Sequence, residues 1–156
     1  MCIKINEMLG ERALPPLFTR AITEESFEAY RKELVALLER EVYGTAPAAP
    51  AAVRVSELSR KEKDFAGKGK RLELTLFFDT DKGEFSFPVT VLIPNGVTQR
   101  VPMFVMLNFR PDVPDKYLPV EEVLDAGYGV LRIYYNDVTA DKDDGFTSGL
   151  AAMYDR

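Results

Sequence analysis

The sequence predicts an α/β protein whose mixed sheet begins as an antiparallel meander and continues into a parallel βαβ unit. Three observations predict this class. Apolar residues recur at helical spacing early in the chain, alternate with polar residues in its middle third, and form two nearly unbroken runs in its last third. The chain has 156 residues, 46% of them hydrophobic and 29% charged, which suits one globular domain or part of one.

Residues 1–22 show no pattern, and we expect an irregular segment there. Residues 23–44 should form a helix that Thr23 caps, with two glutamates in its first turn and Gly44 at its end. Its apolar stripe comprises Phe27, Tyr30, Leu34, Leu37, Leu38 and Val42. We expect the stripe to be buried against the meander, which follows a short Ala/Pro stretch.

The apolar period changes to two over residues 53–94, which predicts the antiparallel meander. The alternating residues include Leu72, Leu74, Leu76, Phe78, Phe85, Phe87, Val89, Val91 and Ile93. Residues 79–83 lie between two of these runs and are typical of a hairpin turn, in which Gly83 can adopt a positive φ. The stretch from Arg60 to Lys70 is rich in lysine and glycine and predicts a second polar connection.

Residues 102–156 should contain the βαβ unit and the start of a further helix. The apolar run 103–107 is typical of a strand buried on both faces, and residues 128–135 form a second such run. Residues 118–126 fit a short crossover helix between them, so the two strands should be parallel. We expect the further helix to begin near Thr147.

Composition excludes several classes of function. The chain has no histidine, so it cannot by itself build a Ser-His-Asp or Cys-His site or a histidine-ligated metal site. A net charge of −5 argues against nucleic-acid binding through bulk electrostatics. No apolar stretch approaches the roughly 20 residues that cross a membrane, and no targeting segment is apparent. The single cysteine, Cys2, is an incidental thiol that fits a reducing compartment, so we expect a cytoplasmic location.

Side chains that could carry chemistry are few. Ser148 lies in a Gly-Phe-Thr-Ser-Gly segment that misses the G-x-S-x-G register, so a helix-cap or turn role is expected for it. The acidic cluster of Asp137, Asp141, Asp143 and Asp144 does not fit the EF-hand template and predicts a solvated loop. We therefore assign no catalytic residue, no metal site and no cofactor.

The segment after the first apolar run is the best candidate for a functional loop. Asn108, Phe109 and Arg110 fall at the carboxyl end of a predicted parallel strand, where open α/β sheets bind their ligands. Arg110 could hold an anionic group bidentately, or it could form an ordinary surface salt bridge.

Several short motifs, in order, resemble the amino-terminal part of α/β-hydrolases of the acetyl-xylan-esterase and glucuronoyl-esterase type. They are Glu41–Gly44 followed by Pro47, Leu107–Phe109, Gly127–Tyr128, and Tyr135–Val138 with Asp141. The resemblance covers about residues 25–156. It implies an incomplete α/β-hydrolase-like fold in which the backbone N–H of Phe109 or Arg110 serves an oxyanion hole. Asn108 stands where many relatives of the wider fold have histidine.

The resemblance implies the amino-terminal portion of a serine carboxylic-ester hydrolase, with acylated carbohydrate as the substrate class. In such enzymes the nucleophile, acid and histidine lie further along the chain, so this truncated chain should be inactive alone. The alternative is a non-catalytic, stand-alone α/β binding or oligomerisation module. In the hydrolase arrangement, strand 103–108 would lie at the open side of the sheet. Because it carries no charge, we expect a homodimer or larger homo-oligomer through it.

Overall fold

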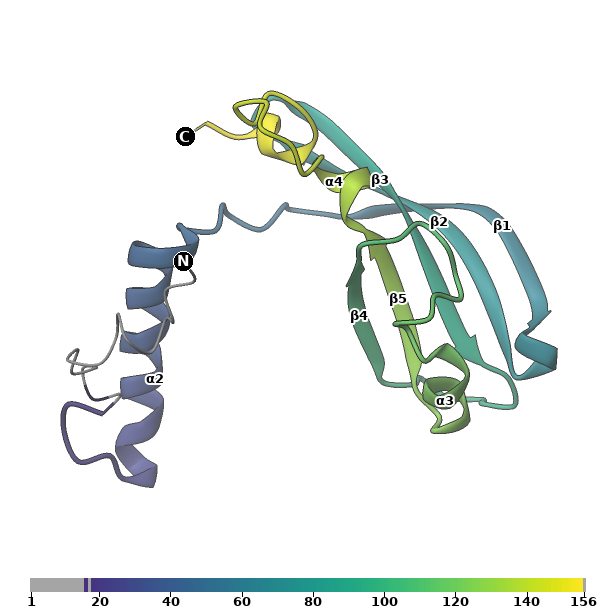
Figure 1. Cartoon of the computed structure of the whole chain (residues 1–156), viewed down its shortest axis with the longest axis horizontal. Helices are drawn as coiled ribbons and strands as arrows, with labels where there is room; N and C mark the ends of the chain where they lie inside the picture. Colours follow the sequence, from purple (N-terminus) through teal and green to yellow (C-terminus); the bar gives the residue numbers. More distant parts are fainter. Residues whose placement is uncertain (1–15, 17, 156) are drawn as a thin grey trace, which may run out of the picture. The chain divides into compact units, whose positions relative to one another are not determined.

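The computed structural model describes residue 16 and residues 18–155, which belong to two compact units, Met1–Pro47 and Ala48–Arg156. Figure 1 labels their helices and strands. Cys2 and most of the expected irregular segment 1–22 lie outside the described residues. Among the described residues, no helix combines the length and the apolar character needed to cross a membrane.

The first unit contains helix α2 (Glu24–Leu38), which continues as a π-helical turn, η1 (Glu39–Tyr43). Thr23 forms a capping box with Ser26: each side chain accepts a hydrogen bond from the other residue's backbone N–H, at 3.3 and 2.9 Å. Gly44 ends the helical segment with φ at 81°. The predicted helix and both of its boundaries are therefore confirmed.

The apolar stripe of α2 is only partly buried. Tyr30 is 5% exposed, with Phe18 and Arg20 packed against its ring. Phe27, Leu37 and Leu38 are 49%, 44% and 45% exposed, so the described part of their own unit does not bury them. Packing of the stripe against the meander stays a prediction.

The second unit is built on a five-stranded mixed sheet with the order β1-β2-β3-β5-β4. Its strands are β1 (Arg54–Asp64), β2 (Gly69–Thr80), β3 (Gly83–Pro94), β4 (Met103–Asn108) and β5 (Gly129–Tyr134). Neighbouring strands are antiparallel except β4 and β5, which are parallel. The predicted meander and the parallel βαβ unit are thus confirmed.

The two connections of the meander differ from each other. The β2–β3 hairpin turns as predicted, with Gly83 at φ 119°. The polar connection expected over residues 60–70 is much shorter, because β1 continues to Asp64 and only the 3₁₀ turn η2 (Phe65–Gly67) and Lys68 separate it from β2. The sequence hid the second half of this strand because β1 is exposed on both faces and its register shifts at Leu58, so apolar residues do not alternate there.

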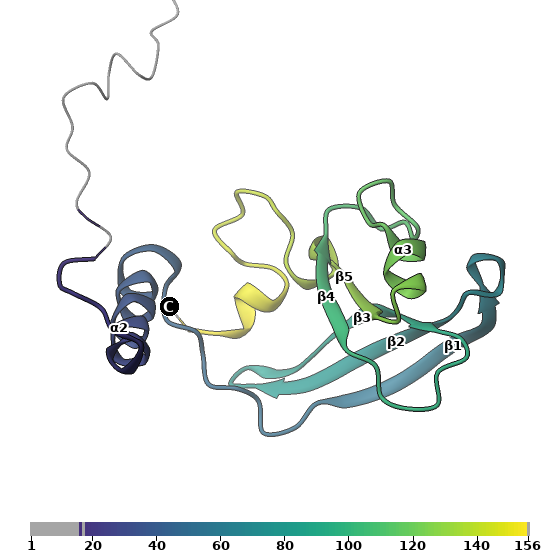
Figure 2. The same ribbon diagram turned by 90° about the horizontal axis from the view of Figure 1, so that it is seen from below.

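Helix α3 (Val120–Asp125) connects β4 to β5 and covers one face of the sheet beside β3 and β5 (Figure 2). The buried cluster beneath it consists of Leu92, Leu118, Val120, Leu124 and Val130. The expectation that strand 103–107 is buried on both faces is wrong among the described residues. Val105 and Leu107 are 68% and 67% exposed, because β4 is an edge strand.

The last part of the chain is less helical than the sequence suggested. A short helix, α4 (Tyr135–Val138), follows β5 and was not expected. The helix predicted near Thr147 is wrong: only one 3₁₀ turn, η3 (Leu150–Met153), forms there. Gly149 before it has φ 64° and ψ −157°, a conformation that cannot lie inside a helix running on from Thr147, and Asp144 holds the preceding segment in turns.

Candidate functional site

The predicted loop follows β4 directly and runs from Phe109 to Pro119, where α3 begins. Because β4 and β5 are parallel, the loop starts at the shared carboxyl edge of both strands. This edge is where open α/β sheets place their ligands. The sheet itself supplies the groups that fix the loop.

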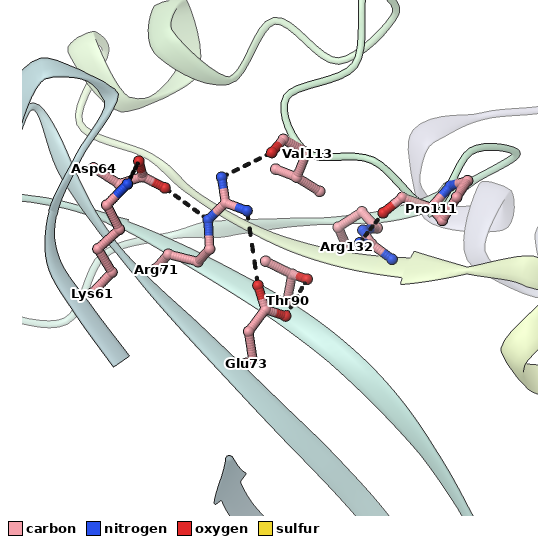
Figure 3. Close-up of polar contacts among 8 residues, drawn as sticks. All are labelled: Lys61, Asp64, Arg71, Glu73, Thr90, Pro111, Val113 and Arg132. Carbon is pink, nitrogen blue, oxygen red and sulfur yellow. Dashed lines mark hydrogen bonds and ion pairs between the residues drawn. The ribbon is translucent and has the colours of Figure 1, made fainter. Parts of the chain in front are cut away.

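Arg71 holds the loop from β2 (Figure 3). Its Nη2 donates a 2.8 Å hydrogen bond to the backbone oxygen of Val113, and its Nε donates a 2.7 Å bond to Asp64 Oδ2. Its Nη1 lies 3.9 Å from Glu73 Oε1. The carboxylates of Asp64 and Glu73 therefore balance the charge of the Arg71 guanidinium, while its Nη2 group binds the loop.

Asp64 is the carboxylate that orients Arg71. It is 9% exposed and also accepts a 2.8 Å hydrogen bond from Lys61 Nζ. Burial raises the pKa of Asp64, but the hydrogen bonds from Lys61, Arg71 and the backbone of Phe65 outweigh burial and hold that pKa below its ordinary value. The carboxylate is therefore ionised at neutral pH and keeps Arg71 in place.

Arg132 holds the loop from β5. Its Nη2 donates a hydrogen bond to the backbone oxygen of Pro111, as Figure 3 shows. The residue is 9% exposed, and among the described residues its Nε finds no hydrogen-bond partner and its guanidinium no carboxylate. In a trans peptide the N–H points opposite to the C=O, so the N–H of Asp112 is directed away from Arg132. Two arginines from two strands thus fix two carbonyls of one loop.

The three residues predicted for the site are consecutive but face different surroundings. Asn108 is 5% exposed, and its Nδ2 is buried without a hydrogen-bond partner among the described residues. Phe109 is 77% exposed, with its ring centroid 5.3 Å from that of Tyr135. Asn108 therefore belongs to the interior, whereas Phe109 forms the outer side of the site.

Arg110 has partners within the loop. Its guanidinium lies 5.0 Å from the ring centroid of Tyr117, and its Nε lies 3.9 Å from Asp115 Oδ1. Asp115 is buried, and the same Oδ1 accepts a hydrogen bond from the backbone N–H of Tyr117. Of the two roles open to Arg110, the structure shows the intramolecular contact.

Ser148 and the acidic cluster form a turn. Ser148 Oγ donates a 2.6 Å hydrogen bond to Asp144 Oδ2, and the backbone N–H of Phe146 donates a 2.9 Å bond to Asp144 Oδ1. These bonds, above all the one from Ser148, hold the pKa of Asp144 below its ordinary value. Within the described part of the chain, no three His, Cys, Asp or Glu residues come together as metal ligands would.

Arg71 and Arg132 were missed as site residues. For Arg132 the sequence holds a signal: it is the only charge in an otherwise apolar run, and a charge buried in a strand needs a polar partner. For Arg71 the sequence holds none, because its alternation with leucines is equally typical of a solvent-facing side chain.

No family model matches the sequence, and no curated protein matches it. Among solved structures, the glucuronoyl esterase from Solibacter usitatus aligns with a TM-score of 0.69 and 22% identity, over 87% of this chain and 42% of that one. A promiscuous CE15 esterase from the marine bacterial metagenome aligns with a TM-score of 0.61 and 20% identity, over 85% of this chain and 41% of that one. The chain thus spans less than half the length of either esterase. Over that length it has the partial α/β-hydrolase-like fold seen in these glucuronoyl and CE15 esterases.

Proposed function

We propose that the chain is the amino-terminal portion of a serine carboxylic-ester hydrolase and supplies one wall of its active site. The observation that carries the proposal is the hold of Arg71 and Arg132 on the loop after β4. Oxyanion stabilisation depends on donors that are already in place before the charge develops. A loop whose carbonyls are fixed by one buried and one partly buried guanidinium group meets that requirement.

The backbone N–H of Phe109 or Arg110 is the oxyanion donor in this proposal. Both residues follow β4 directly, at the position from which this fold class commonly lends an N–H to the tetrahedral intermediate. The exposed ring of Phe109 and the ring of Tyr135 beside it would form an apolar side of the acyl site. Esterified carbohydrate is the proposed substrate class, in keeping with the glucuronoyl esterase that the chain resembles in fold.

The nucleophile and base would come from sequence outside these 156 residues. The chain has no histidine, so it cannot assemble the usual base of such an enzyme. Ser148, its best-placed serine, is engaged with Asp144 in a turn. Alone, the chain should therefore hydrolyse no ester.

Two measurements test the proposal. The purified 156-residue chain should hydrolyse a p-nitrophenyl ester no faster than the same chain after denaturation. Sequencing the gene beyond the codon for Arg156 should reveal a G-x-S-x-G segment and a later histidine. Hydrolysis at an enzyme-like rate by the chain alone would contradict the proposal, and so would a stop codon after Arg156.

The second candidate is a stand-alone α/β binding or oligomerisation module. The buried cluster around Leu92 and Val130 favours it, because that cluster gives the sheet a core from these residues alone. A stop codon together with normal expression and cooperative unfolding would support this candidate. The same sequencing experiment therefore separates the two functions.

A cytoplasmic location belongs to the proposal as well. It is supported by the single cysteine, which suits a reducing compartment. Fractionation of cells that express the tagged natural gene would test it: recovery from the periplasm or the medium would contradict it.

A further inference from the structure

The two edges of the sheet carry opposite kinds of side chain. Edge strand β1 has charges at seven of its eleven positions, and its pairing with β2 is interrupted by register shifts. Edge strand β4 has no charge in its six positions. Charges and bulges are the usual means by which proteins prevent an edge from pairing with another strand. One edge of this sheet is therefore protected and the other is not.

The β4 edge is also accessible. It pairs with β5 on one side and with no other strand among the described residues. Phe104, Val105 and Leu107 are 56%, 68% and 67% exposed. Backbone groups and apolar side chains of a regular strand are thus available together, which is the combination that another strand can bind.

We propose that, in the 156-residue chain without the sequence that would complete a hydrolase, the β4 edge binds the β4 edge of a second copy, antiparallel, about a two-fold axis that passes near Met106. A two-fold axis there places Val105 of one copy beside Leu107 of the other, twice. Both side chains are exposed, apolar and on the same face of the sheet, so the pairing covers four of them.

Charges on either side of β4 support a second copy as the occupant. Arg100 and Asp112 each lie six positions from Met106, are exposed, and have no ion-pair partner among the described residues. Antiparallel pairing about Met106 brings Arg100 of one copy to the end of the strand where Asp112 of the other lies. The flanks therefore attract each other, whereas the β1 edge of another copy presents mostly charged side chains.

The oligomeric state of the full chain tests the proposal by sedimentation velocity. At about 50 µM the chain should sediment as a dimer, as expected for a dissociation constant near 1 µM or below. Val105→Lys should weaken the dimer at least about tenfold, because it places a charge on the paired edge. Val55→Lys is the matched control: Val55 is 58% exposed on β1, and the same change there should leave the dimer intact.

A charge-swap experiment tests the register of the pairing and distinguishes a loss of pairing from a loss of folding. Leu107→Glu should also give a monomer, and an equimolar mixture with the Val105→Lys variant should restore a heterodimer, because position 105 of one copy lies beside position 107 of the other. Circular dichroism should show both variants folded.

Three results would overturn the proposal. The first is a stable monomer at about 50 µM, far above the expected dissociation constant. The second is a dimer that Val55→Lys disrupts and Val105→Lys does not. The third is a pair of folded variants that fail to associate when mixed.

Discussion

Arg132 on β5 and Pro111 in the loop after β4 are joined by a hydrogen bond from the guanidinium Nη2 to the backbone oxygen, across 21 positions of sequence. Among the described residues this is the one hydrogen bond that the buried guanidinium of Arg132 makes. The same bond attaches the loop to the sheet. The conformation of the loop therefore depends on a residue that the loop covers.

Replacing Arg132 with methionine should free the loop while keeping the sheet. Methionine fills similar space but donates no hydrogen bond, so amides around residues 109–113 should exchange at least about tenfold faster, given about 1.5–3 kcal/mol for a bond from a charged donor. The free energy of unfolding should change by less than about 1.5 kcal/mol, because an unpaired buried charge disappears as well. Hydrogen exchange with mass spectrometry measures the first quantity and urea unfolding the second.

Lys63→Met is the control for this experiment. Lys63 on β1 is exposed and makes no ion pair within the described residues, so its replacement should leave loop exchange unchanged. Equal exchange in both variants and the unchanged chain would show that Arg132 does not hold the loop.

Asp64→Asn should destabilise the fold in a pH-dependent manner. The pKa of Asp64 is lower in the folded chain than its unfolded value of about 3.9, so the carboxylate stabilises the fold fully above about pH 5. That contribution is lost as the pH falls through the folded pKa. At pH 7 the free energy of unfolding of the variant should be about 2 kcal/mol lower than that of the unchanged chain. The difference from the unchanged chain should shrink steadily below pH 4.

Urea unfolding at several pH values measures this difference. Asp143→Asn, at an exposed position, should show no such pH dependence. A constant deficit for Asp64→Asn from pH 7 to pH 3 would mean that the ionised carboxylate is not what stabilises the Arg71 contact.

Much of the second unit could be predicted from the sequence because its strands have two different faces. On β2 and β3, apolar residues such as Leu74 and Val89 share one face, and the period of two follows from the pleat. The order in which β5 lies between β3 and β4 came from the resemblance. The local sequence pattern of a strand does not show which other strands lie beside it in the sheet.

The parts that were missed depend on contacts between distant segments. Arg71 reaches Val113 across 42 positions, and only the assembled sheet brings them together. Leu58 lies at a register shift on an edge strand and is 65% exposed, although it is apolar. Neither result can be read from propensity, because each is set by pairing geometry.

Leu92→Ala should be among the most damaging changes to the core. Leu92 has no exposed surface and contacts the cluster beneath α3, so removing its side chain should cost about 2–5 kcal/mol. Leu58→Ala, at an exposed leucine of the same sheet, should cost less than about 0.5 kcal/mol. Thermal or urea unfolding of the two variants gives the comparison. Similar losses would mean that the buried cluster is not the main source of stability.

Gly69→Ala should destabilise the junction between β2 and α3. A Cβ atom at this position would lie 2.8 Å from Leu124 Cδ1 and 2.9 Å from the backbone oxygen of Ile93. The leucine can move, but the carbonyl belongs to the sheet, so the strands must shift at a cost of about 1–3 kcal/mol. Urea unfolding checks this value, and a stabilised variant would contradict the close approach at Gly69.

The unequal edges of the sheet also determine where growth stops. If two sheets join edge to edge through β4, the combined sheet has ten strands and ends on both sides in a β1 strand. Each outer strand presents its row of lysines, arginines and acids to any further copy. The same asymmetry that opens one side to association therefore terminates it after a single event, so the chain should yield a closed pair rather than a fibre.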